Sequence, residues 1–190
     1  MEKGYSKWRK LDNAALAFPL VTGENDTRVF RFYCQLKEEV DSDILQQALD
    51  RTMEKYPLFQ AVLRKGLFWF YLEHSHIRAL VKPETEPPCS RLYIPDKKSL
   101  LFQVSYYKER INFEVFHALT DGTGAMHFLQ ELVQNYLILA HPKENFPEIR
   151  REKKTGRGNI EEDSFSQYYS SDIPKNREKK KAAVKLKGEK

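Results

Sequence analysis

The residues best suited to chemistry are a histidine, an aspartate and a glycine that follow one another closely, at His117, Asp121 and Gly122. Apolar side chains alternate over residues 111–116, so the period of two places His117 at the end of an apolar strand face. An imidazole at such a boundary is suited to act as a general base. Asp121 could hold the following turn by accepting hydrogen bonds from backbone N–H groups or a guanidinium. Gly122 would allow a positive φ or the close approach of a substrate.

Three simpler interpretations of this segment stand beside the catalytic one. His117 could be a hydrogen-bonded residue at the edge of the core, with no chemical role. His117 and Asp121 could be two ligands of a metal ion, although no third ligand follows nearby in the sequence. Residues 121–124 (Asp-Gly-Thr-Gly) are also suited to a turn that caps the helix after it.

The elements that would position this segment alternate between strand-like and helix-like patterns. β-Branched and aromatic residues predict strands at residues 29–36, 59–63, 67–72, 100–107 and 111–116. Capping residues at 41–43 begin a helix predicted over 44–53, which Pro57 ends. A second helix, over 125–140, has apolar residues around most of its circumference and should be largely buried. This order predicts an α/β domain in which helices pack on a mixed, largely antiparallel sheet.

The polar residues of the second helix and the other histidines have simple expected places. We expect the narrow polar face of that helix to carry His127 and Glu131, and both His127 and His141 to lie at the surface. His74 and His76 would share one strand face, where they could bind a metal ion or simply mark an exposed strand end.

Residues 117–122 (His-Ala-Leu-Thr-Asp-Gly) are similar to the His-His-x-x-x-Asp-Gly signature of the acyl-CoA-dependent acyltransferases. This superfamily includes chloramphenicol acetyltransferase, alcohol acetyltransferases and the condensation domains of peptide synthetases. Residues 8–15 and 56–64 also look like the alcohol acetyltransferase branch. The resemblance extends over about residues 5–175 and includes the Gln-Tyr-Tyr of residues 167–169.

The resemblance implies a chloramphenicol-acetyltransferase-like fold and a role for each motif residue. His117 would take the proton from an alcohol or amine acceptor as that acceptor attacks the thioester carbonyl of acyl-CoA. Asp121 would hold the loop through an arginine partner, and Gly122 would leave space in the channel. Acyl-CoA, such as acetyl-CoA, would be a co-substrate, with no bound cofactor and no metal. No covalent acyl-enzyme is implied, so neither Cys34 nor Cys89 is needed as a nucleophile.

Two departures from the family pattern shape this expectation. Phe116 replaces the first histidine of the signature and, by strand alternation, should point away from His117. The family is also built from two similar halves, and the Asp-Phe-Gly-x-Gly segment of the second half does not occur here. The chain should therefore resemble the N-terminal half, which would need a second half-domain or another copy of itself. The alternative function is a non-catalytic half-domain that acts as a binding or assembly module.

Composition and charge limit the other classes of function. Of 190 residues, 41% are apolar, which is enough for one domain, and we expect residues 1–141 to form it, followed by a polar linker and basic segment over 142–190. The net charge of +5 comes from the last fifteen residues, which hold seven Lys or Arg against two Glu. A neutral body argues against nucleic-acid binding. No apolar run would span a membrane and no signal peptide is visible, so the expected location is the cytoplasm.

Overall fold

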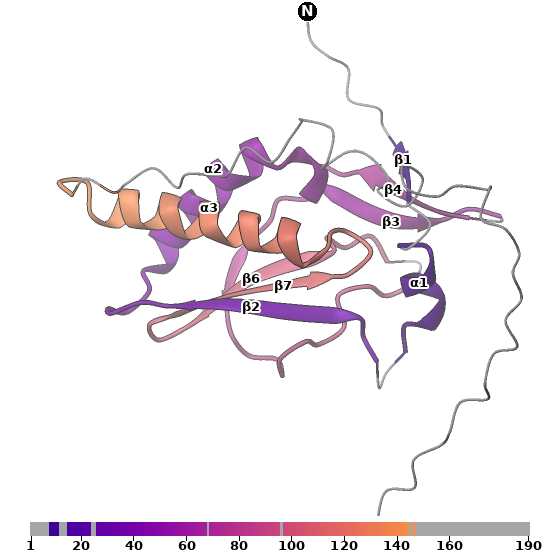
Figure 1. Ribbon diagram of the computed structural model, residues 1–190, viewed down its shortest axis with the longest axis horizontal. Helices are drawn as coiled ribbons and strands as arrows, with labels where there is room; N and C mark the ends of the chain where they lie inside the picture. Colours follow the sequence, from indigo (N-terminus) through magenta and orange to yellow (C-terminus); the bar gives the residue numbers. More distant parts are fainter. Residues whose placement is uncertain are drawn as a thin grey trace, which may run out of the picture.

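The computed structural model describes residues 8–11, 15–23, 26–67, 69–95, 97–144 and 146, and these form strands and helices in mixed order (Figure 1). In chain order they are β1 (Trp8–Lys10), α1 (Ala17–Val21), β2 (Val29–Gln35), α2 (Ser42–Lys55), the 3₁₀ helix η1 (Pro57–Phe59), β3 (Ala61–Lys65), β4 (Phe70–His74), β5 (Val81–Pro83), β6 (Phe102–Tyr107), β7 (Arg110–Phe116) and α3 (Gly122–Ala140). Within the described residues, no helix is long and apolar enough to cross a membrane.

The strands form two sheets. The larger has the order β2-β7-β6-β5, with antiparallel pairs except for β5 and β6, which are parallel. The smaller has the order β1-β4-β3 and is antiparallel throughout. The α/β class with a mixed, largely antiparallel arrangement is therefore confirmed, although the strands divide between two sheets.

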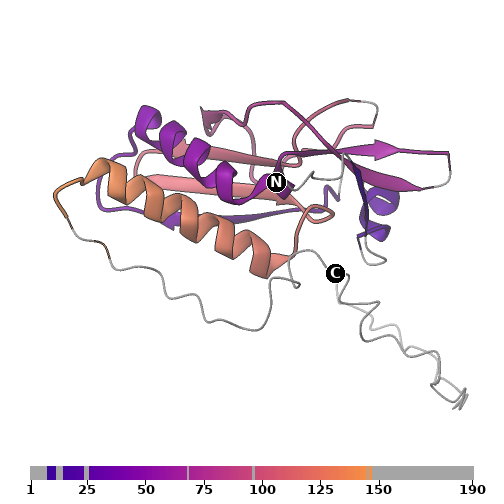
Figure 2. The same ribbon diagram turned by 90° about the horizontal axis from the view of Figure 1, so that it is seen from above.

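The two long helices begin where the sequence provides a capping aspartate. The carboxylate of Asp41 accepts hydrogen bonds from the backbone N–H groups of Asp43 and Ile44, which starts α2. Pro57 follows the end of this helix and begins η1. The Asp41 N–H donates to the Tyr136 hydroxyl at 2.9 Å and so fastens the start of α2 to α3. Seen from above, α2 and α3 lie side by side (Figure 2).

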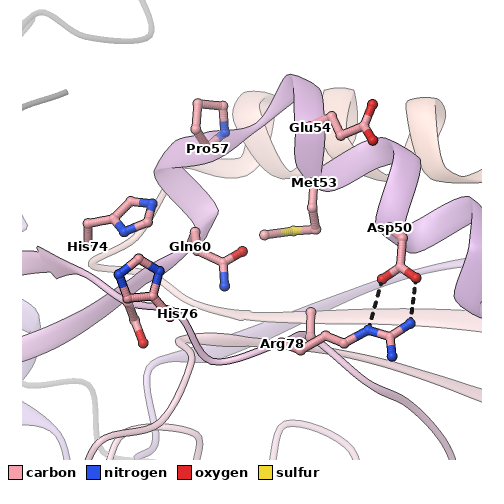
Figure 3. A pocket seen from close by; sticks show the side chains of 10 residues that line it. Asp50, Met53, Glu54, Pro57, Gln60, His74, His76 and Arg78 are labelled. Carbon is pink, nitrogen blue, oxygen red and sulfur yellow. Dashed lines mark hydrogen bonds and ion pairs between the residues drawn. The ribbon is translucent and has the colours of Figure 1, made fainter. Parts of the chain in front are cut away.

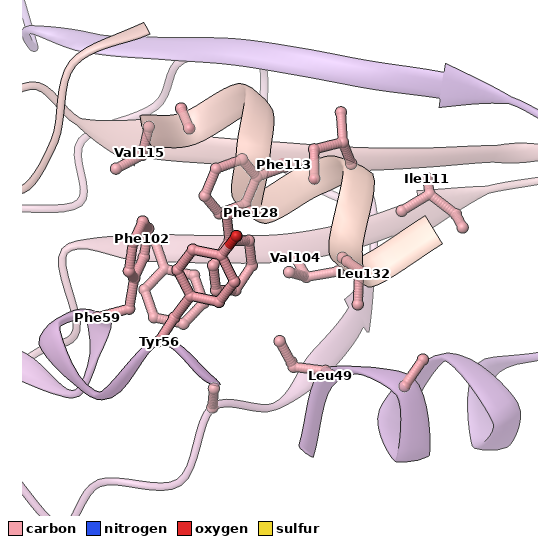
Figure 4. Packing of buried hydrophobic residues seen from close by; sticks show 14 of the residues in the cluster. Leu49, Tyr56, Phe59, Phe102, Val104, Ile111, Phe113, Val115, Phe128 and Leu132 are labelled. Carbon is pink, nitrogen blue, oxygen red and sulfur yellow. The ribbon is translucent and has the colours of Figure 1, made fainter. Parts of the chain in front are cut away.

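The main core lies between these two helices and one face of the larger sheet (Figure 4). Phe113 of β7 stacks on Phe128 of α3, with ring centroids 4.7 Å apart, and Phe59 of η1 stacks on the same ring at 4.5 Å. Buried aromatic rings of this kind contribute much of the apolar area that stabilises a core. The position of α3, and with it the turn before α3, is therefore fixed by aromatic packing on β7.

A second cluster joins residues of the smaller sheet to residues 11 and 15 and to the end of β7. It contains Leu11, Ala15, Val29, Leu63, Phe70, Tyr93, Leu101, Phe116 and Ala118. Phe116 is fully buried there and stacks on Tyr93 at 5.5 Å, in the cluster opposite to the one that holds Phe113 and Val115. The sheet therefore has an apolar cluster on each side at the end where β7 finishes.

One expectation about the polar residues of α3 needs correction. Glu131 is not on a solvated face: it is buried, 4% exposed, and forms an ion pair with Lys55, because α2 packs against that side of α3. His127 and His141 are partly exposed at the surface, and the His141 imidazole contacts the Glu38 carboxylate at 2.5 Å. Helix α3 ends at Ala140, and the division of the chain at residue 141 stays a prediction, because most of residues 142–190 lie outside the described residues.

Candidate functional site

His117 is the first residue after β7, and a backbone hydrogen bond fixes its position. Its N–H donates to the Arg28 carbonyl, 2.9 Å away, just before β2 begins. The N–H of Leu119 donates to the Phe116 carbonyl at 2.9 Å, which closes a tight turn around the histidine. The backbone therefore leaves the sheet at His117, at the end of a strand that has neighbours on both sides.

Two aromatic rings contact the imidazole of His117. Phe18 of α1 stacks nearly parallel to it, with centroids 4.4 Å apart and an interplanar angle of 17°. Phe30 of β2 lies at 4.9 Å and is tilted by 56°. The histidine is half-buried, so one part of the imidazole lies against aromatic carbon while another part remains accessible. Such a side chain can accept a proton from a bound molecule and is restricted in the directions it can face.

Asp121 caps α3. Its carboxylate accepts a hydrogen bond from the Gly124 N–H at 2.8 Å, and its carbonyl accepts the Ala125 N–H at 3.0 Å. The turn-holding role through backbone N–H groups is thus the one the geometry shows. Among the described residues, no arginine forms an ion pair with Asp121, and no hydrogen bond joins Asp121 to His117. The carboxylate is exposed to solvent and acts on the loop rather than on the imidazole.

The two glycines of the turn have different reasons to be glycine. At Gly122 the φ is not in the positive range, which excludes the first of the two uses expected of this glycine, and an added Cβ would meet the Phe32 ring at 4.0 Å, an ordinary contact. At Gly124 an added Cβ would lie 2.1 Å from the Thr120 hydroxyl oxygen, which is a severe overlap. The tight packing in this turn is therefore at Gly124, and the space beside Gly122 is open.

A buried ionic cluster on the other face of the larger sheet supports the same strands. Arg31 of β2 and Glu114 of β7 lie directly opposite each other, with 3.0 Å between the Arg31 Nε and the carboxylate. Arg31 also pairs with Glu84 at 2.5 Å, and the backbone N–H of Cys89 donates to Glu114 at 2.6 Å. Burial lowers the pKa of Arg31, but its hydrogen bonds to Glu84 and Glu114 outweigh this and raise it. The cluster fastens the segment around Cys89 to the sheet.

A separate pocket of about 440 Å³ lies between the end of α2 and the end of β4 (Figure 3). His74 and His76 both line it, with ring centroids 5.4 Å apart, and Arg78 is held by two hydrogen bonds to Asp50. In the part of the chain that the structure describes, no three His, Cys, Asp or Glu side chains are grouped as metal ligands. His117 is not among the residues that line this pocket, so the histidine pair is not part of the His117 site.

The sequence pattern predicts His117 and Asp121 as site residues but did not indicate the two rings that contact the imidazole. Phe18 lies in a five-residue helix that contains Pro19, and nothing in its local pattern predicts a helix. Phe30 could have been found, because it lies opposite Val115 across β2 and β7 and therefore shares the face that ends at His117. The contact with Phe18 depends on the tertiary fold.

Comparison with known proteins supports the fold. No protein-family model and no curated protein sequence matches this chain. Among solved structures, the starter condensation domain of the rhizomide synthetase RzmA is 12% identical, with a TM-score of 0.59 over 75% of this chain and 40% of that one. Polyketide synthase associated protein 5 from Mycobacterium tuberculosis is 18% identical, with a TM-score of 0.53 over 73% and 35%. The tallysomycin biosynthesis protein TlmII is 14% identical, with a TM-score of 0.54 over 76% and 44%.

The described α/β architecture is therefore that of one part of a condensation-domain fold. At these identities the likeness shows the fold alone. The chain spans less than half the length of each of the three structures. A variant of the RzmA domain has been solved in complex with C8-CoA, with a TM-score of 0.60 to this chain, and another with C8-CoA and Leu-SNAC.

Proposed function

We propose that this chain carries the catalytic histidine of an acyl-CoA-dependent acyltransferase, with His117 as the general base. The observation that carries the proposal is the place of His117: half-buried, at the end of the central strand β7, and one turn before α3 in a condensation-domain-like fold. The motif His-x-x-x-Asp-Gly occurs at this position. Neighbours of the same fold that were solved with C8-CoA support an acyl-CoA donor.

The proposed reaction needs one base and no acyl-enzyme. The acceptor's hydroxyl or amine gives its proton to the His117 imidazole while its oxygen or nitrogen forms a bond to the thioester carbonyl carbon. The tetrahedral intermediate then collapses, the carbon–sulfur bond breaks, and the CoA thiolate takes up the proton. The products are an ester or amide and free CoA thiol. A base positioned in this way contributes about 10²–10⁴-fold in rate.

Asp121 and Gly122 have supporting roles in the proposal. Asp121 caps α3 and so fixes the turn that begins at His117. Gly122 keeps the side of the turn that faces Phe32 free of a side chain, where substrate could approach. For the acceptor we propose an alcohol, as in alcohol O-acetyltransferases, on the resemblance of residues 8–15 and 56–64; an amine is the alternative.

We propose further that the active form includes a second half-domain, because the chain spans only about 40% of the RzmA domain. The same observation favours one other function, a non-catalytic half-domain that binds or assembles with a partner. In that case His117 would be dispensable.

The test is an assay of CoA thiol release and product formation, with the chain both alone and joined to any residues that follow it in its natural reading frame. Acetyl-CoA and C8-CoA would serve as donors, and a primary alcohol and a primary amine as acceptors. Transfer that depends on His117 supports the acyltransferase. An absence of transfer with every donor and acceptor, in both forms of the protein, would leave the assembly module as the better account.

A further inference from the structure

We infer that Phe18, on the short helix α1, is a positioning residue that holds the His117 imidazole in its working orientation. This inference rests on the proposed role of His117 as a base. The two residues are far apart in the sequence, but their rings stack at 4.4 Å with an interplanar angle of 17°. Near-parallel stacking is one of the arrangements found for aromatic pairs.

The imidazole lies at the junction of the two apolar clusters. Phe30, which contacts it at 4.9 Å, packs against the main core, whereas Phe18 packs against the second cluster. Each cluster thus supplies one ring. Rotation of the His117 side chain away from its observed position would separate it from at least one of these rings. The ring of Phe18 covers one face of the imidazole and leaves its edge, where the ring nitrogens lie, free of that contact.

Helix α1 contributes little to the apolar core apart from Phe18. None of its five residues is fully buried, and Leu20 and Val21 are 74% and 52% exposed. Within α1, Phe18 is the residue that packs against the second cluster. A short helix that contributes so little to the core, yet places one ring against a histidine, fits the positioning of that histidine better than the stabilisation of the fold.

Three hydrogen bonds connect Phe18 and His117 to one segment of chain, residues 22–28. The Phe18 carbonyl accepts the Thr22 N–H at 3.1 Å, and the Thr22 hydroxyl donates to the Thr27 carbonyl at 3.4 Å. The next carbonyl, that of Arg28, accepts the His117 N–H at 2.9 Å. Helix α1 and His117 are therefore both anchored at the same end of β2, which fixes the position of the Phe18 ring relative to the imidazole. A base held in this way is oriented before the substrate binds.

The test compares three variants. Phe18→Leu keeps an apolar side chain but removes the flat ring, Phe18→Tyr keeps the ring, and Leu20→Ala is the matched control on the same helix. We expect Phe18→Leu to lower kcat by about 10²-fold, the scale of a misplaced catalytic group, with the KM for acyl-CoA little changed. Phe18→Tyr should restore most of kcat, and Leu20→Ala should resemble the wild type. Thermal unfolding checks that each variant is folded.

Proton NMR can detect the stacking of Phe18 on His117 without an activity assay. In the wild type, ring current from Phe18 should shift the His117 ring protons upfield, and Phe18→Leu should remove that shift while Phe18→Tyr retains it. Unchanged kcat or an unchanged shift in folded Phe18→Leu would overturn the inference. If His117→Ala loses transfer while Phe18→Leu does not, the positioning role fails and the proposed function stands. If His117→Ala retains full transfer, both fail.

Discussion

The turn from His117 to Gly124 holds its geometry through very few atoms. Asp121 provides one side-chain hydrogen bond to the start of α3, and Gly124 gives the Thr120 hydroxyl the space that a Cβ would take. The imidazole itself is held from outside the turn, by Phe18 and Phe30. At the scale of single residues, the imidazole of His117 is thus one group, and the residues that fix the turn or contact the imidazole are others.

The role of Asp121 can be separated from its charge. Asp121→Asn keeps a side-chain oxygen that can accept the Gly124 N–H, whereas Asp121→Ala loses the cap and should cost about 1 kcal/mol of stability. If Asp121 acts by capping α3, Asn should retain most of the transfer activity and most of the unfolding free energy. Urea unfolding and the thiol-release assay measure the two effects. Equal loss of activity in Asn and Ala would show that the negative charge itself is required.

Gly124 offers a test of the packing within the turn. Gly124→Ala would bring its Cβ to 2.1 Å from the Thr120 hydroxyl oxygen, so we expect a loss of about 1–3 kcal/mol, typical of overpacking. Thr120→Ala removes that oxygen, and the remaining atoms near the new Cβ lie at 3.4 Å or more. A double-mutant cycle by urea unfolding should therefore show that Gly124→Ala costs much less in the Thr120→Ala background. The same cost in both backgrounds would contradict the described turn.

At the scale of elements, the ends of β2 and β7 bring the site together. The strands pair directly over their whole length, from Val29 with Phe116 to Gln35 with Arg110. On one face their side chains join the aromatic core, and on the other Arg31 and Glu114 form a buried ion pair. Opposite charges directly across a strand pair stabilise its register. A shift of one residue in the pairing of β2 with β7 would place the charges in the apolar core. The ion pair therefore also fixes the position of the end of β7, and with it the position of His117.

The ionic cluster predicts how stability depends on pH. Burial alone would raise the pKa of Glu84, but hydrogen bonds from Arg31 and Arg110 and their positive charges hold it below its ordinary value of 4.5. A carboxyl group whose pKa is lower in the folded state contributes stability above its unfolded pKa and loses it as the pH falls through the folded value. The unfolding free energy should therefore decrease as the pH falls below about 4.5.

Glu84→Gln isolates this contribution, and the exposed Glu39→Gln is its control. Urea unfolding between neutral and acidic pH should show that Glu84→Gln is less stable than the wild type at neutral pH and that the difference narrows in acid. Glu39→Gln should follow the wild-type curve. A constant difference between Glu84→Gln and the wild type across the whole pH range would contradict the ion pairing.

The long elements could be predicted from the sequence, whereas the short ones could not. The periodicity and capping residues of α2 and α3, and the alternation in β2, β6 and β7, are local signals, and the structure places these elements within a few residues of the expected bounds. β1, α1 and β5 have three to five residues each and depend on neighbours far along the chain. For the same reason the local motif predicts His117 and Asp121 as site residues, whereas the contact of Phe18 with His117 depends on the fold.

At the scale of the whole molecule, the described residues form one part of a larger known architecture. The chain spans 40% of the RzmA starter condensation domain and 44% of TlmII. The His117 imidazole is half-buried, so part of it remains open to solvent. We propose that a second half-domain shields this side of the molecule during transfer, since exclusion of water strengthens the interactions within an active site. Transfer activity should therefore be higher when the chain is joined to a second half-domain than when the chain is alone.

The most direct test of the account is acyl transfer by the His117→Ala variant. It is compared with the wild type and with His127→Ala, each joined to the same second half-domain. His127 is a half-buried histidine of α3 and serves as the matched control. We predict that His117→Ala lowers kcat for CoA release by about 10²–10⁴-fold, the contribution of a general base, while His127→Ala stays near the wild type. Turnover by a folded His117→Ala variant at the wild-type rate would contradict the assignment of His117 as the catalytic base.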